Sequence, residues 1–70
     1  MQRYIVHATV YKYDEGLEAE TKANVNHVFE AENKNKAKEK AIQKFMEDYQ
    51  HPKISKIEVK IDKIDLINEI

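Results

Sequence analysis

The chain has no cysteine and no tryptophan, and it has one glycine, one proline and one arginine among its 70 residues. Without cysteine it can form no disulfide and offers no thiolate to a metal, so its stability depends on a small core or on a partner. The lack of cysteine also fits a reducing cytoplasm. Because Arg3 is the single arginine, the chain has little of the residue that binds phosphates, carboxylates and guanine in a bidentate way.

Long apolar runs are also missing from the sequence. No segment is apolar over the length that a bilayer requires, and the N-terminus leads directly into a strand pattern without the apolar core of a signal peptide. A net charge of −1 gives no general attraction to nucleic acid or to membranes. Lys, Asn and Ile are abundant, as an A+T-rich coding genome would also produce. We therefore expect a soluble cytoplasmic protein of a bacterium or phage, with no membrane partner.

Hydrophobic patterning predicts two strands in the first half of the chain. Residues 3–13 are rich in β-branched and aromatic residues and carry apolar side chains on both faces, which is typical of a central strand. Residues 22–31 alternate between apolar and polar, which indicates a half-buried antiparallel strand. The segment 14–21 between them holds four acids and the glycine. It is expected to form an acidic loop at the tip of a long hairpin.

The second half of the chain predicts a helix, a strand and a tail. Asn33 is a typical N-cap and Pro52 ends the helix, which is expected over residues 34–50. Its apolar stripe has helical spacing and consists of Ala37, Ala41, Ile42, Phe45 and Tyr49. Residues 54–63 alternate as a strand, and a shift of that alternation near Asp62 and Lys63 predicts a bulge or a break there. The apolar tail 64–70 is expected to pair with a neighbouring molecule or to cover the open side of the sheet.

These elements predict a single α+β domain over residues 1–70 with the order ββαβ. The apolar character of strand 3–13 on both faces places it in the centre of a three-stranded antiparallel sheet of order 2-1-3. The helix then covers one face of the sheet, and nothing else in the chain is left to cover the other. This uncovered face is expected to show Ile5, His7, Thr9, Tyr11, Tyr13 and Val28.

The sequence offers little that favours catalysis or metal binding. None of Thr9, Thr21 and Ser55 lies in a nucleophile-elbow motif. The three histidines lack the HxH and HxxxH spacings of zinc ligands. We interpret His27 as half-buried beneath the helix, and His7 and His51 as exposed. The sequence therefore predicts a protein that is not an enzyme and that holds no metal and no cofactor.

The beginning of the helix carries the wrong charge for its dipole. A helix N-terminus favours acidic residues, yet this one is rich in lysine. One interpretation is an anion site or nucleic-acid-binding site, in which phosphates contact the lysines while the tyrosines stack on bases. The lysines concerned are Lys34, Lys36, Lys38, Lys40 and Lys44. The other interpretation is a solvated face in a lysine-biased composition, which we favour.

The uncovered face and the acidic loop predict a protein-binding surface. Tyrosine is enriched at protein interfaces because it adds contact area at a low entropic cost. The predicted contact residues are Ile5, Tyr11, Tyr13, Asp14, Glu15 and Glu18. The leading hypothesis is thus a small accessory protein, an inhibitor or adaptor, that binds a protein partner stoichiometrically and forms a homodimer. The alternatives are the nucleic-acid-binding module and a structural subunit whose apolar tail pairs with its neighbours.

Overall fold

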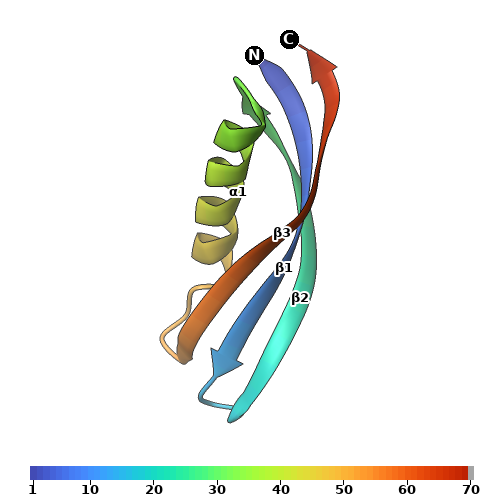
Figure 1. The fold of residues 1–70 in the computed structure, drawn as a ribbon. Helices are drawn as coiled ribbons and strands as arrows, with labels where there is room; N and C mark the ends of the chain where they lie inside the picture. The colour runs from blue at the N-terminus through green and yellow to red at the C-terminus, as the bar shows by residue number, and fades with distance from the viewer. Residues whose placement is uncertain (70) are drawn as a thin grey trace.

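The structure is a computed structural model that describes residues 1–69, and it has the predicted ββαβ order (Figure 1). The elements are β1 (Gln2–Asp14), β2 (Ala19–Ala31), α1 (Lys34–Tyr49) and β3 (Ile54–Glu69). β1 is antiparallel to both neighbours, so the sheet has the order β2-β1-β3, and α1 packs against one face of it. The predicted α+β fold and strand order are confirmed.

The core lies between α1 and the central strand. On β1 the four buried apolar residues are Tyr4, Val6, Ala8 and Val10, which alternate along the strand and therefore share the helix-facing side. The other buried apolar residues are Phe29 and Ala31 of β2 and Ala37, Ala41 and Phe45 of α1. The Phe29 and Phe45 rings meet edge to face, with centroids 6.0 Å apart at 82°. The fully buried side chains are no larger than valine, so these two rings supply much of the core's apolar area.

α1 begins where Asn33 caps it, as predicted. The Lys36 backbone N–H donates to Asn33 Oδ1 at 2.9 Å, which satisfies one of the free N–H groups of the first turn. The two small buried residues on the stripe, Ala37 and Ala41, let the helix lie close to the sheet. Ile42 and Tyr49 are half-buried at the sides of that stripe.

β3 is longer than predicted. The segment 64–69, expected as a tail, continues the strand and pairs with the start of β1 up to Gln2 opposite Glu69. This segment therefore pairs with β1 of its own chain and does not cross the open side of the sheet. Ile70 lies outside the described residues. Three register shifts leave Ser55, Asp62 and Ile67 unmatched on β3. Of the predicted bulge or break near Asp62 and Lys63, the structure has the bulge, and a bulge of this kind resembles the end of a strand in the sequence pattern.

The turn between β1 and β2 is shorter than the predicted loop 14–21. β1 reaches Asp14 and β2 starts at Ala19. The Asp14 carboxylate accepts hydrogen bonds from the backbone N–H groups of Gly16 at 2.8 Å and Leu17 at 3.3 Å. This local bonding closes the turn early, as aspartate does in turns.

The molecule is long and thin. Its extents are 44 × 17 × 14 Å, whereas the 16 residues of α1 span about 24 Å. The sheet therefore runs well past the helix, most visibly at the β1–β2 turn (Figure 1). The accessible surface is 4973 Å², compared with about 4,600 Å² for a compact monomer of this mass. Within residues 1–69, α1 is neither long nor apolar enough to cross a membrane.

Candidate functional site

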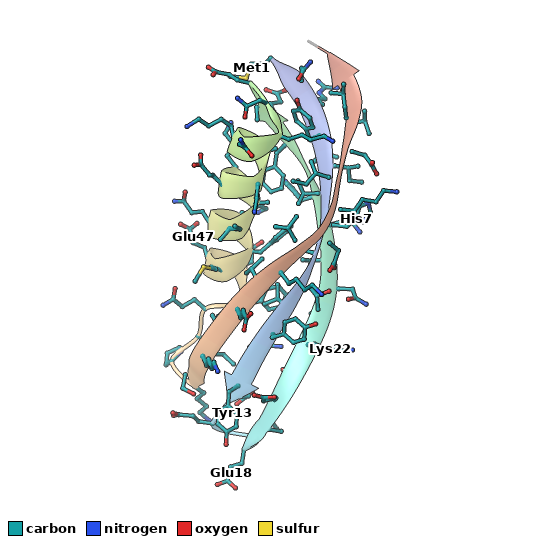
Figure 2. The ribbon with its side chains drawn as sticks, viewed as in Figure 1. Met1, His7, Tyr13, Glu18, Lys22 and Glu47 are labelled. Atoms are coloured by element: carbon teal, nitrogen blue, oxygen red, sulfur yellow. The ribbon has the colours of Figure 1, made fainter. Side chains whose placement is uncertain are left out.

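The side of the sheet away from α1, called the open face below, has side chains from all three strands. The register places Tyr11 between Lys22 and Glu58, and Tyr13 between Glu20 and Lys56. Figure 2 shows His7 and Lys22 on this side and Glu47 on the outer side of α1. The charged residues of the open face in residues 2–67 are the basic Arg3, Lys22, Lys56, Lys60 and Lys63 and the acidic Glu20, Glu30, Glu58, Asp62 and Asp65. Five charges of each sign leave this face neutral.

A polar band divides the open face at its centre. Thr9 is only 8% exposed, and its hydroxyl donates to Asp62 Oδ2 at 2.7 Å. The side-chain amide of Asn24 lies 3.2 Å from the same hydroxyl on the other side. The bulge at Asp62 therefore places a carboxylate over the central strand, and this polar band separates the apolar residues of the uncovered face into two groups.

This band separates Ile5 from the tyrosines with which it was grouped. Ile5 lies opposite Val28 and Asp65, six residues or about 20 Å along β1 from Tyr11. The prediction that both positions lie on the uncovered face is confirmed. Their distance places Ile5 outside the surface that surrounds the tyrosines.

The tyrosines lie beside the β1–β2 turn, where the sheet extends past the helix. Tyr11 is 41% exposed and Tyr13 is half-buried. They line a shallow cavity of about 150 Å³ together with Lys12, Glu20, Lys56 and Glu58. We call this region, together with Glu15 and Glu18 at the turn, the turn-end surface. Its cavity is smaller than the roughly 300–1,000 Å³ typical of small-molecule sites.

The acids of the turn divide into two groups. Asp14 is half-buried, and its Oδ1 accepts two hydrogen bonds from the turn's own backbone, so it shapes the turn in addition to its predicted role as a contact residue. Glu15 and Glu18 are exposed, and Figure 2 shows Glu18 at the tip of the hairpin beyond Tyr13. The backbone of Glu18 is left-handed, with a φ of 51°, and the Glu15 N–H donates to the Lys53 carbonyl at 2.8 Å.

Lys12, Lys56 and Glu58 of the turn-end surface were not identified from the sequence, and Glu20 was identified only as part of the acidic loop. Glu20, Lys56 and Glu58 lie opposite Tyr13 and Tyr11 on the neighbouring strands. The grouping of Lys56 and Glu58 with the tyrosines depends on the register of β3, which changes at the unmatched Ser55 and Asp62 on either side of this segment. An alternation pattern alone does not define which β1 residues they pair with, so the sequence contains no direct signal for this grouping.

The helix lysines lie on the other side of the molecule. Lys34 and Lys38 are exposed, and α1 covers the face of the sheet opposite the tyrosines. The remaining three have partners within the chain: Lys36 with Glu39 at 3.4 Å, Lys44 with Asp48 at 3.4 Å, and Lys40 with the Glu30 carbonyl. A ligand would have to wrap around a sheet edge to contact both the lysines and the tyrosines.

The histidine environments differ from the predicted ones. His27 faces the helix side but is exposed, and its ring meets Phe29 at 4.9 Å and 65°. The reason is that β2 is an edge strand, so this side chain lies beside α1 rather than beneath it. His7 is half-buried on the open face, and His51 is exposed, as predicted. In the part of the chain that the structure describes, no three His, Asp or Glu side chains are grouped so that they could hold a metal ion.

Compared with models of known protein families, with curated proteins and with solved structures, the chain has no significant match. A small α+β fold is shared by proteins of many functions. The function of this chain is therefore inferred from its own surfaces.

Proposed function

We propose that this protein is a small non-enzymatic binding protein that acts by stoichiometric contact between its turn-end surface and another protein. The observation that carries the proposal is the pair Tyr11 and Tyr13, displayed on the central strand without cover from α1. Strands on both sides hold β1, so the tyrosine backbones are already fixed before binding. Such preorganisation lowers the entropic cost of association, and tyrosine itself has few rotatable bonds.

The charges around the tyrosines indicate the kind of partner. Among the exposed charged residues of the turn-end surface, Lys56 is basic and the others, Glu15, Glu18, Glu20 and Glu58, are acidic. Interfaces combine an aromatic centre with a polar rim whose charges complement the partner. The matching surface is a basic rim around an apolar pocket that receives a tyrosine ring. An inhibitor that occludes such a pocket, or an adaptor that occupies it, fits this description.

The same features favour a protein partner over other ligands. The cavity beside the tyrosines is too small to enclose a drug-sized molecule. The open face has equal numbers of basic and acidic residues in 2–67, whereas nucleic-acid binding depends on an excess of basic ones. A neutral face with a local acidic excess is suited to a protein surface.

Capture of the partner tests the proposal. Tagged wild-type protein is incubated with bacterial lysate treated with nuclease, and bound proteins are identified by mass spectrometry. The test variant is Tyr11→Thr/Tyr13→Thr, because threonine keeps a high strand propensity while it removes both rings. The matched control is Lys34→Ala/Lys38→Ala, which changes two exposed side chains on the opposite side of the molecule.

We expect the wild type and the lysine variant each to capture one protein in stoichiometric amount. The tyrosine variant should no longer capture this protein. Circular dichroism and urea unfolding must show that the tyrosine variant is folded. Capture that survives loss of the tyrosines but not loss of the lysines would refute the assignment. Capture that disappears on nuclease treatment would instead indicate nucleic acid.

A further inference from the structure

The two edges of the sheet differ in regularity. β3 forms one edge, and its three unmatched residues interrupt its pairing pattern. Bulges of this kind are one means by which proteins block edge-to-edge association. β2 forms the other edge, and its pairing with β1 is unbroken from Ala19 to Ala31. It contains no proline and no glycine, so nothing in its sequence interrupts its outer row of backbone N–H and C=O groups, although the Glu30 carbonyl also accepts a hydrogen bond from Lys40, which a second strand would displace or share.

We propose that β2 pairs antiparallel with β2 of a second copy of this chain, centred on Asn26. In such a pair, directly opposite residues lie on the same face of the sheet. The result is a continuous six-stranded sheet of order 3-1-2-2-1-3 with both helices on one side. This inference is independent of the proposed function, because it uses the sheet edge and not the turn-end surface.

Charge complementarity selects the register. When the pair is centred on Asn26, residues 21–31 of each copy are paired and Lys22 of each copy lies opposite Glu30 of the other. Both side chains are exposed on the open face. The symmetric arrangement therefore contains two opposite-charge pairs across the new strand boundary, and such cross-strand pairs stabilise a sheet.

Neighbouring registers lose this match. Centring the pair on Val25 places Glu20 opposite Glu30, which gives two like-charged pairs. Centring it on His27 shortens the pairing to residues 23–31 and places Asn24 opposite Glu30. The match between Lys22 and Glu30 thus identifies a second copy, rather than a foreign strand, as the occupant of this edge.

The helix side of the edge is also suited to a second copy. His27 is exposed beside Phe29, and in this register it lies opposite Val25 of the other copy, while Phe29 lies opposite Ala23. The two β1 strands would be three strand spacings, about 14 Å, apart. Two helices about 10 Å in diameter then fit side by side, with the exposed His27 side chains of both copies at the boundary between them.

Sedimentation equilibrium of charge-reversal variants at low salt tests this dimer. Each of Lys22→Glu and Glu30→Lys converts both opposite-charge pairs into like-charged pairs in its own homodimer. Self-association of each variant alone should weaken about tenfold or more. An equimolar mixture of the two variants restores opposite charges at both positions, and it should recover the wild-type dimer mass. Lys60→Glu is the matched control, since it makes the same charge change on β3 and should leave the dimer unchanged.

The mixture experiment also guards against damage to the monomer. Glu30 lies 3.7 Å from Arg3, so Glu30→Lys changes a contact within its own chain. Mixing with Lys22→Glu would not restore that contact, so recovery of the dimer would report on the contact between the two copies. A wild-type protein that stays monomeric up to its solubility limit overturns the proposal. So does a dimer that both β2 variants leave intact, or one that Tyr11→Thr/Tyr13→Thr abolishes. None of these results depends on whether the turn-end surface captures a partner.

Discussion

Replacing Phe45 by alanine is expected to remove a large part of the free energy of unfolding. Phe45 is 3% exposed, and its ring meets Phe29 edge to face. The other two buried residues of α1 are alanines. Phe45 is therefore the one large, fully enclosed side chain that joins the helix to the sheet.

The size of the effect follows from the small core. Truncation of a buried phenylalanine to alanine costs about 3–5 kcal/mol. A chain of 70 residues has a total stability of roughly 3.5–10 kcal/mol. Phe45→Ala should thus remove about a third of the free energy of unfolding at the upper end of this range, and should unfold the protein at the lower end. Phe45→Leu keeps most of the apolar volume and should cost roughly 1–1.5 kcal/mol.

Urea unfolding followed by circular dichroism at 222 nm measures these differences. Met46→Ala is the control, because Met46 is next in sequence but exposed, and it should change stability by only about 0.5 kcal/mol. A loss below about 1.5 kcal/mol for Phe45→Ala, or one equal to that of Met46→Ala, would show that this residue does not hold the helix on the sheet.

Three further substitutions test other parts of the structure in the same unfolding assay. Thr9→Val and Asp62→Ala should each cost about 1 kcal/mol and the double variant no more than either, since both remove one hydrogen bond; fully additive losses would contradict this. Lys34→Glu should stabilise by about 0.3–1 kcal/mol because α1 has no acid in its first turn, and a loss would show that the lysine has a stabilising contact. Glu18→Gly should stabilise by up to about 1 kcal/mol by relieving the left-handed backbone, and destabilisation would argue against that conformation.

The strand order and the helix were predictable because their signals are local and periodic. β1 carries apolar residues on both faces, which places it at the centre of the sheet, and Asn33 with the stripe through Phe45 defines α1. The end of the second strand's pattern at Ala31 also agrees with the structure. The residues that give the signal for the helix, and for the helix-facing side of β1, are the ones that are buried or that form the cap.

The parts that could not be predicted depend on long-range register. The shift at Asp62 was visible in the pattern, but the continuation of β3 to Glu69 was not, because bulges at Asp62 and Ile67 each change the phase of the alternation. The partners of Tyr11 and Tyr13 on β3 follow from the same register. The exposure of His27 follows from the width of the helix relative to the sheet, which no local pattern contains.

The turn-end surface borders the β2 edge, since Glu20 lies on β2 and Lys22 lies opposite Tyr11, but the proposed dimer uses the outer backbone of β2 and leaves the tyrosine rings uncovered. In the proposed dimer the two open faces join on one side of the six-stranded sheet, and each copy keeps its own tyrosine pair. A dimer would then present two turn-end surfaces at opposite corners of one sheet. Partner binding by such a dimer would have a stoichiometry of two to two.

The most direct test of the central claim is the dissociation constant of the captured partner for the wild type and for Tyr11→Thr/Tyr13→Thr, measured by isothermal titration calorimetry on folded proteins. Interface residues that dominate binding contribute about 2 kcal/mol or more each. The account predicts that the tyrosine variant binds at least about 30-fold more weakly, while Lys34→Ala/Lys38→Ala binds like the wild type. Equal affinity of the wild type and the tyrosine variant would contradict the assignment of the turn-end surface as the binding site.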